Sequence, residues 1–422
     1  MNVHRPSRLA VHGYRRTDLR TQFALPACAA LVFVALGQAA VGCPFCVSLK
    51  PTLTQRREAA SVVVLGEFRE RDGKQAVFRL HQFLQGQSLL SEGKGTGAKE
   101  TGENLRVTTD TEFKPGALVL LFGEAPKVEG ASPKSVAEKA PPAKAAGKPE
   151  LSWSHIGVNE LSFAYVARAP SSRKAPAERL RYFARYLEHD DALMAEDAYQ
   201  EFGHTPFDKV AEVAEAFDQA KLRRWLGDEH LPDYRKGLYG VALGLAKSAE
   251  DRKANEELMR KLIDEQSEDF IAGFDGVLGG YLLLAGDRGL KHLEERYLAN
   301  PKSADGHVRH TLTALRFYHE YGREISRPRL RQALRLLLDR PEFAAPAIVD
   351  LARWQDWESL DRIAGLYGQK QYEAPGIKRA IVGYLLVCPG EPAAKHLDRL
   401  RRTDPKTVAD AEKSISLFGG NR

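Results

Sequence analysis

The chain has 422 residues, of which 43% are hydrophobic and 28% are charged, and its formal net charge is +6 at neutral pH. This length allows two or three domains, and this composition excludes a collagen-like or wholly disordered chain. The positive charge does not predict a nucleic-acid partner, because much of the net charge comes from arginines of the N-terminal leader and lysines of an insert. The folded parts are therefore nearer to neutral.

Residues 1–42 predict a signal peptide. A basic region precedes an apolar run, Phe23–Leu36, and small residues follow it. This order is typical of secretory leaders that a peptidase removes. The sequence Ala40-Val41-Gly42-Cys43 also resembles a lipobox, which would place a lipid on Cys43. We therefore expect an exported protein, periplasmic or on the cell surface, that contacts the membrane only through its leader or through a lipid anchor.

Three cysteines follow the leader: Cys43, Cys46 and Cys388. Export places them in an oxidising compartment, and an odd number leaves one thiol free, lipidated or paired with another chain. The Cys-Pro-Phe-Cys spacing is that of a thiol–disulfide motif, whereas a zinc site would need two further ligands nearby. We predict that Cys43 and Cys46 form a structural disulfide or that Cys43 carries an anchor, with a redox or metal site as the alternative. No catalytic residue and no cofactor is predicted.

Residues 43–170 predict a β domain. Short apolar or alternating runs, separated by turn residues, favour strands at Ala60–Phe68, Ala76–Leu84, Leu105–Thr109, Ala117–Phe122, Leu151–Ile156 and Leu161–Val166. Many short strands with turns between them are typical of a small barrel or sandwich. Residues 124–150 interrupt this pattern with Ala, Pro and Lys. Such a composition cannot bury enough apolar surface to become ordered, so we interpret these residues as a disordered insert.

Residues 173–422 predict a helical domain that begins after the Ala169–Ser172 boundary. One pattern recurs there, with an apolar first residue, Leu or Ile at the fifth position and Gly or Ala at the seventh; its copies are residues 234–241, 274–281, 308–315 and 377–384. An interval of about 35–40 residues, here once doubled, is typical of two-helix solenoid repeats. Small residues let two helices approach closely, so we expect buried helix contacts at the seventh residues, Gly240, Gly280, Ala314 and Gly383.

Two polar patterns in the helical domain are weaker candidates for sites. His307 and His310 lie three residues apart on one predicted helix, which would let both face one metal, but no Asp or Glu stands at the offset of a known metal motif. We expect both histidines on a solvated face. Arg327, Arg331 and Arg335 recur every four residues opposite leucines, so they would either bind an anionic surface or form a solvated face.

Four features of the β domain occur in a particular order: Cys43-Pro44-Phe45-Cys46, the strand Ser61–Gly66, the run Val77–Leu84 before Gly86, and the run Pro115–Phe122. These features resemble the netrin/TIMP-like group of OB-fold modules, and the helical part resembles HEAT-type repeats. The whole layout resembles a family of uncharacterised exported bacterial proteins that open with Cys-Pro-Phe-Cys. The resemblance implies an α+β multidomain fold, in which a small OB-like β-barrel precedes an α-solenoid of HEAT-like helix pairs.

The resemblance also implies a role for the first cysteine. In TIMP-type inhibitors, the N-terminal cysteine chelates the metal of a protease through its amino group and carbonyl. Cys43 would take this place if the leader is cleaved just before it. The spacing differs, because the inhibitors have Cys-x-Cys where this chain has Cys-x-x-Cys.

These patterns predict an exported, non-catalytic binding or scaffold protein that acts through a helical-repeat surface. The expected partner is a protein or another component of the cell envelope, and nucleic acid is not expected. The sequence contains no phosphate-binding loop, serine-hydrolase elbow or zinc-protease helix motif, so it favours a protein that is not an enzyme without deciding the matter. Two alternatives stay open: a redox or metal-binding protein that uses the Cys43/Cys46 pair, and a protease-inhibitor-like module.

Overall fold

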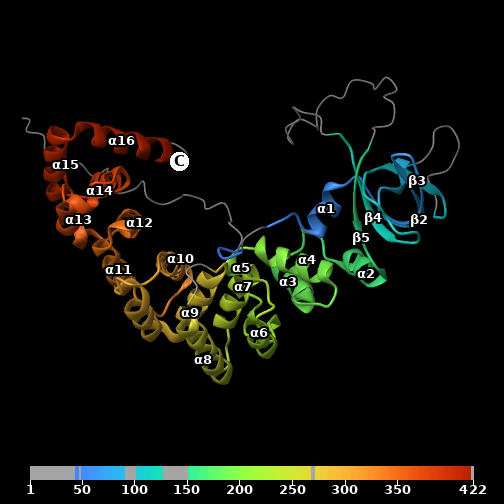
Figure 1. Ribbon diagram of the computed structural model, residues 1–422, viewed down its shortest axis with the longest axis horizontal. Helices are drawn as coiled ribbons and strands as arrows, with labels where there is room; N and C mark the ends of the chain where they lie inside the picture. The colour runs from blue at the N-terminus through green and yellow to red at the C-terminus, as the bar shows by residue number, and fades with distance from the viewer. Residues whose placement is uncertain (1–42, 47–48, 91–100, 127–150, 268–270, 420–422) are drawn as a thin grey trace, which may run out of the picture.

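The computed structural model describes residues 43–46, 49–90, 101–126, 151–267 and 271–419, and for residues 416–419 the backbone alone. The predicted signal peptide and almost all of the predicted insert lie outside these described residues. The fold is mixed α+β: a five-stranded antiparallel sheet is followed by a long series of helices (Figure 1). The α+β class and the order of its two parts are therefore confirmed.

The sheet has the strand order β3-β2-β1-β4-β5, and all neighbouring strands are antiparallel. Its strands are β1 (Val62–Asp72), β2 (Gln75–Gln85), β3 (Asn104–Thr108), β4 (Leu118–Glu124) and β5 (Ser152–Gly157). A two-residue loop joins β1 to β2, and it begins with Gly73 at φ +56°. This left-handed conformation suits glycine and allows the tight hairpin that the Asp72-Gly73 pair predicts.

The central strands β1 and β4 are buried on both faces, which explains their unbroken apolar sequences. Val62, Val64 and Leu121 point into a core formed by side chains of β1, β2, β3 and β4. Their chain neighbours Val63 and Phe122 point the other way and join the core of the helical part. Because successive side chains of a strand alternate between faces, one apolar run serves both cores.

The predicted strand Leu161–Val166 is wrong, since these residues lie in helix α2 (Glu160–Arg168). Asn159 caps this helix, and its side chain accepts a hydrogen bond from the Ser162 N–H at 2.9 Å. Phe163 and Val166 face the core with helical and not alternating spacing. A helix-capping residue outweighs the short alternating pattern here. A second short helix, α1 (Leu53–Ala59), was not predicted and precedes the sheet.

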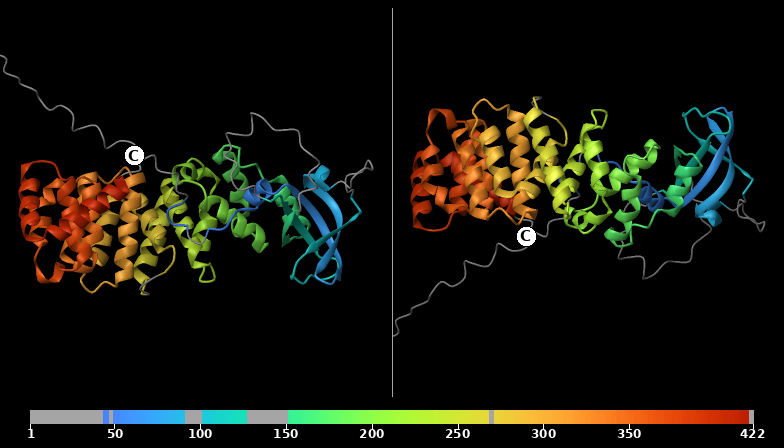
Figure 2. Two further views of the ribbon diagram at one scale, coloured as in Figure 1. Left: turned by 90° about the horizontal axis from the view of Figure 1, so that it is seen from above. Right: turned by 90° about the horizontal axis from the view of Figure 1, so that it is seen from below.

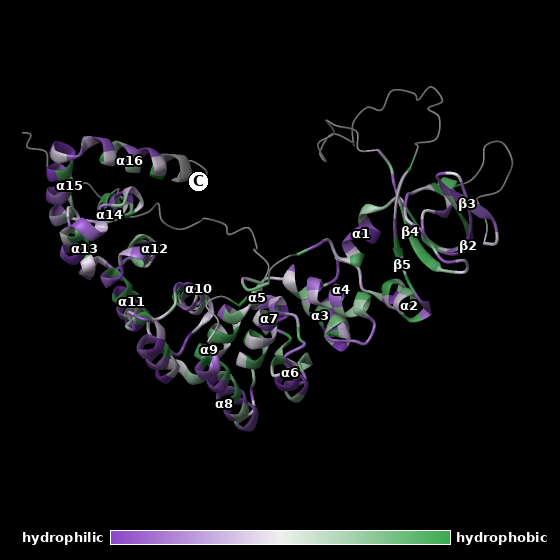
Figure 3. Cartoon of the chain, in the orientation of Figure 1, coloured by the Kyte–Doolittle hydropathy of each residue, from purple (hydrophilic) through white to green (hydrophobic). Residues whose placement is uncertain are grey.

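The helices after α2 form a curved row with the sheet at one end (Figures 1 and 2). They are α3 (Pro176–Phe183), α4 (Ala192–Gly203), α5 (Phe207–Ala211), α6 (Gln219–Leu226), α7 (Asp233–Gly244), α8 (Ala249–Glu265), α9 (Phe274–Leu293), α10 (Asp305–Tyr321), α11 (Arg327–Arg335), α12 (Pro341–Arg353), α13 (Leu360–Leu366), α14 (Pro375–Val387), α15 (Glu391–Thr403) and α16 (Pro405–Gly419). Helices α10, α12 and α14 lie on the inner side of the curve, and α11, α13 and α15 on the outer side. Figure 3 shows many hydrophilic residues on the outer helices α8 and α15.

The helical row is tightest between α7 and α9. A Cβ atom at Gly240 would lie 2.6 Å from the backbone nitrogen of Val277, and one at Gly280 would collide with the carbonyl oxygen of Gly240. Ala314 on α10 is fully buried. The predicted close contact therefore exists at Gly240 and Gly280, and Ala314 is buried as predicted.

The fourth predicted contact, at Gly383, is wrong. This residue is partly exposed, and a Cβ atom there would meet nothing within 4 Å. The sequence pattern places Gly383 in register with the buried glycines, but no neighbouring helix covers this side of α14. Replacing Gly383 with a larger residue would therefore not overpack a helix contact.

Candidate functional site

The Cys-Pro-Phe-Cys motif forms a small closed turn. Cys43 and Cys46 are joined by a disulfide, with their Cα atoms 5.3 Å apart, and the Cys46 N–H donates to the Cys43 carbonyl at 3.2 Å. The Cys43 N–H donates to the carbonyl of Gly203, at the end of α4, at 2.9 Å. Cys43 is 5% exposed. In this state its sulfur is bonded to Cys46 and is not available for a lipid thioether.

Phe45 anchors this turn in the helical row and not on the sheet. Its side chain is 1% exposed, and its ring lies edge-on to the ring of Phe317 with centroids 4.7 Å apart. Glycines make the space: a Cβ atom at Gly237 would lie 2.8 Å from the Phe45 carbonyl oxygen, and one at Gly279 would lie 3.0 Å from the ring. The motif thus packs against α7, α9 and α10.

From this anchor the chain runs along α4 toward the sheet. We call residues 43–46 and 49–51 the strap. The Lys50 N–H donates to the side chain of Gln200, and the Lys50 carbonyl contacts the ring nitrogen of His204, both at 2.9 Å. Thr52 follows the strap, and its hydroxyl caps α1 by accepting a hydrogen bond from the Gln55 N–H. Both backbone groups of Lys50 are therefore satisfied by side chains at the C-terminal end of α4 or directly after it.

A buried carboxylate, Asp197 on α4, joins three helices. It accepts a hydrogen bond from the Leu53 N–H of α1 at 2.6 Å and one from the hydroxyl of Tyr165 on α2 at 2.7 Å. Burial raises the pKa of Asp197 to about 6, although both hydrogen bonds favour its ionised form. Burial and the Asp197 charge raise the pKa of Tyr165 well above its usual value, so Tyr165 stays a donor.

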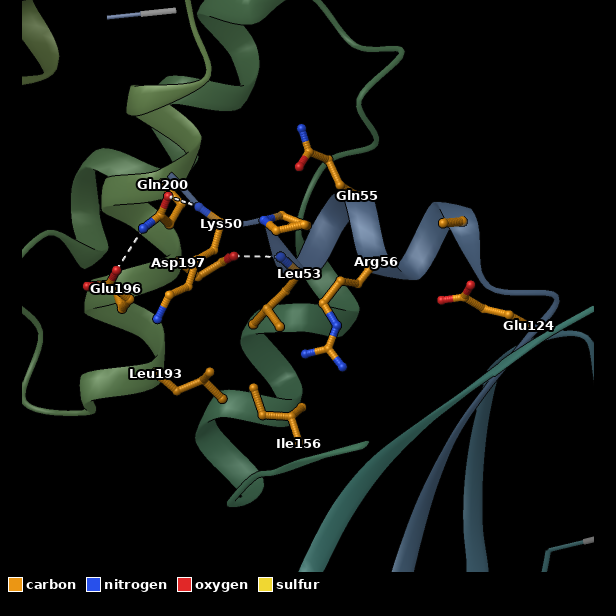
Figure 4. A pocket seen from close by; sticks show the side chains of 12 residues that line it. Lys50, Leu53, Gln55, Arg56, Glu124, Ile156, Leu193, Glu196, Asp197 and Gln200 are labelled. Atoms are coloured by element: carbon orange, nitrogen blue, oxygen red, sulfur yellow. Dashed lines mark hydrogen bonds between the residues drawn. The ribbon is translucent and has the colours of Figure 1, made fainter. Parts of the chain in front are cut away.

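A pocket of about 700 Å³, which we call the junction pocket, opens beside Asp197, between α1, α4 and the ends of β4 and β5 (Figure 4). Its apolar wall includes Leu53, Ile156 and Leu193. Arg56 projects from α1 toward this wall, and its guanidinium lies 4.4 Å from the centre of the Phe122 ring. Burial lowers the pKa of Arg56, while the charges of Glu124 and Asp197 oppose that shift.

Glu196 supplies the acidic side of the same pocket. It accepts hydrogen bonds from Arg235, from the Tyr234 hydroxyl and from the Gln200 amide, each at 2.7 Å. Burial disfavours its charge, but these three donors outweigh burial and hold the pKa of Glu196 below its usual value. The pocket therefore combines an apolar wall with charged side chains of both signs: Lys50, Arg56, Glu124, Glu196 and Asp197.

The two histidines of the predicted weak metal site share helix α10 but do not lie on a solvated face. His307 is 7% exposed and His310 is 4% exposed. The His307 ring centroid lies 5.0 Å from that of Tyr297, and the His310 centroid lies 5.7 Å from that of Phe274. The solvated-face expectation is wrong, because α10 is packed against α9 on this side. Within the described ranges, no group of three or more His, Cys, Asp or Glu side chains is arranged to hold a metal ion.

The three arginines of the predicted stripe on α11 are not equally exposed and do not form one continuous surface. Arg335 is paired with Asp356, with a distance of 2.9 Å between the Arg335 Nε and the carboxylate, and it also contacts Glu358. Arg331 is partly buried and Arg327 is exposed.

The third cysteine, Cys388, is a buried free thiol whose pKa is raised by burial.

Three residues of the junction pocket, Arg56, Asp197 and Glu196, were not predicted from the sequence. They come from segments far apart in the chain and follow no motif spacing. A signal was present in α4, where the acidic residues Asp197 and Glu201 fall on the same side as Met194 and Ala198. Acidic residues on an apolar helix side indicate buried, paired carboxylates.

Comparisons of the chain with protein-family models, with curated proteins and with solved structures found no match. Among the helices in the described part of the chain, none is long and apolar enough to cross a membrane. The function is therefore argued from the geometry.

Proposed function

We propose that this protein is an exported, non-catalytic binding or scaffold protein whose partner binds the inner side of the helical row. In this proposal an OB-like β module precedes an α-solenoid of HEAT-like helix pairs, as in the exported bacterial family that opens with Cys-Pro-Phe-Cys. The disulfide between Cys43 and Cys46 supports export, because such bonds persist in oxidising compartments. The curvature of the row supports a solenoid, since stacked helix pairs give extended concave surfaces.

The observation that carries the proposal is the composition of the inner face. We define the inner face by residues on one side of α10, α12 and α14 that are exposed or partly exposed: Arg309, Thr313, Arg316, Glu320, Glu342, Ala345, Val349, Arg353, Arg379, Gly383 and Leu386. Their spacing of three or four residues places them on one side of each helix. Val349 is 38% exposed, and four of these residues are arginines against two glutamates. Exposed arginines around an apolar residue favour an acidic protein partner.

The cysteine-based alternatives gain less support from the geometry. A TIMP-type mode needs an N-terminal cysteine displayed at the surface, whereas Cys43 is buried and its N–H is bound to Gly203. The disulfide turn holds Phe45 in the helical row, which is a structural role. Both points favour the binding or scaffold function over the redox and inhibitor functions.

Site-specific photo-crosslinking in the native host tests the proposal. A crosslinking amino acid would replace Val349 or Arg379 on the inner face, and a matched control would replace Arg399, which is exposed on the outer helix α15. We expect the two inner positions to capture the same envelope protein and the control not to capture it. The purified partner should then lose affinity for Arg309→Glu but not for Arg399→Glu. Equal binding to both variants, or capture from Arg399 alone, would contradict the proposal.

A further inference from the structure

A second pocket, of about 460 Å³, lies where α10, the start of α11 and the end of α12 meet. Arg316 and Arg353, both of the inner face, line it together with Arg327. The pocket therefore opens onto the inner face. Its lining is mainly polar and cationic, unlike that of the junction pocket beside Asp197.

Three arginines of this pocket face two carboxylates, Asp350 and Glu320, so the lining keeps a net positive charge. Asp350 is buried and accepts from the Arg316 Nε at 2.6 Å, and it lies 3.7 Å from a guanidinium nitrogen of Arg353. One carboxylate thus serves two guanidinium groups. Arg327 makes no ion pair with any carboxylate in the described ranges. Burial lowers the pKa of Arg327, and the positive charges of Arg323 and Arg331 lower it further.

A flat wall closes one side of the pocket. The ring of His319 stacks on the ring of Trp354, with centroids 4.1 Å apart and an angle of 1° between the planes. Burial, with the charges of Arg327 and Arg331, lowers the pKa of His319 to about 4. The imidazole is therefore neutral at physiological pH, and it can donate one hydrogen bond to a ligand without adding further charge.

We propose that this pocket binds an oxyanion group, a phosphate or a carboxylate, carried by the partner that docks on the inner face. Guanidinium groups bind both anions through paired N–H donors, and a pocket with unneutralised arginines gains from an added anion. The proposal rests on the proposed function in one respect, namely that the oxyanion belongs to the protein partner. The pocket's own affinity for a free oxyanion does not depend on that partner.

Calorimetric titration of the full chain tests the proposal, with inorganic phosphate and acetate as separate probes at constant ionic strength. We expect at least one probe to bind, and the tighter probe identifies the oxyanion. Arg327→Gln and Arg353→Gln should each weaken that binding by about tenfold or more, because each removes charge-assisted hydrogen bonds. The matched control, Arg399→Gln on α15, should bind as the wild type does.

Two results would overturn the proposal: neither probe binds, or the probe binds equally to both pocket variants and the control. Circular dichroism identifies a variant that fails to fold, in which case the other pocket variant decides. If one of these two results is obtained but a crosslinked partner is still found, the proposed function stands and only the oxyanion site is refuted. Oxyanion binding without any crosslinked partner would instead overturn the proposed function and confine the site to free anions.

Discussion

The carbonyl oxygen of Phe45 lies so close to Gly237 that a Cβ atom at that residue would be 2.8 Å away. The two residues belong to the first described turn of the chain and to helix α7. Their contact shows that the cysteine motif belongs structurally to the helical part. Glycine is required at this position because the strap backbone occupies the space that any side chain would need.

We predict that Phe45→Ala destabilises the protein more than Cys46→Ser does. Deleting a fully buried phenylalanine ring costs about 3–5 kcal/mol. The disulfide closes a very short loop, so its loss should cost no more than about 2 kcal/mol through chain entropy. Urea unfolding of both variants measures the two losses. A larger loss for Cys46→Ser would mean that the sulfur bridge and not the ring holds the strap.

Two glycine substitutions should change the free energy of unfolding in opposite directions. Gly240→Ala places a methyl group against the backbone of Val277, which should cost about 1–3 kcal/mol of unfolding free energy. Gly383→Ala meets no atom and replaces a glycine within a helix, so it should stabilise by about 0.5–1 kcal/mol. The pair is matched, because both residues hold the same position in the repeat pattern. Melting curves that shift in the same direction for both variants would refute this difference.

Asp197→Asn should change how stability depends on pH. The folded pKa of Asp197 is raised from 3.8 to about 6, so the native state holds a proton that the unfolded chain releases first. Asp197 alone therefore contributes a loss of stability of roughly 3 kcal/mol as pH rises from about 4 through 6. The asparagine amide keeps an acceptor for the Leu53 N–H but cannot ionise.

The measurement is the difference in unfolding free energy between wild type and Asp197→Asn at pH 4, 5, 6 and 7. We expect the Asp197→Asn variant to gain stability relative to the wild type across this range. Burial also raises the pKa of Asp275 to about 6, but that residue is present in both proteins and its effect cancels. Parallel pH profiles would show that Asp197 does not titrate in this window.

Removing residues 127–148 should leave the melting temperature nearly unchanged when a short Gly-Ser turn closes the gap. Strands β4 and β5 pair directly, with Glu124 opposite Ser152 and Gly123 opposite Trp153, so the two ends to be joined are already adjacent. A short antiparallel connection satisfies this geometry. Thermal unfolding of the deletion variant checks the expectation. A drop of many degrees would mean that the deleted residues pack against the fold.

The sequence allowed prediction of the elements that depend on local periodicity and turn chemistry. The strands around Asp72-Gly73 and the four helices that contain the repeat copies, α7, α9, α10 and α14, lie where the residue patterns predict them. The strand prediction for Leu161–Val166 is wrong because six residues can fit both the strand period and the helix period. The cap at Asn159 decides in favour of the helix. Gly383 was misjudged because a repeat pattern defines a register but not which neighbour covers it.

The candidate sites were less predictable than the fold, because long-range packing creates them. The proximity of Cys43 to Cys46 follows from their spacing, but the contact of Phe45 with Phe317 does not. Burial of His307 and His310 depends on where α9 packs, which no local pattern encodes. The same holds for the unneutralised charge at Arg327, since it reflects the positions of residues on three helices.

The strap also constrains the order in which the chain folds. Cys43 and Cys46 are close in sequence, so their disulfide turn can form before distant parts of the chain fold. The aromatic surface that receives Phe45 includes Phe317, which is synthesised much later. Contacts of high sequence separation form slowly because a long loop must close first. We therefore expect the disulfide turn to dock only after α10 has folded, and the strap to be more accessible to proteases before that step.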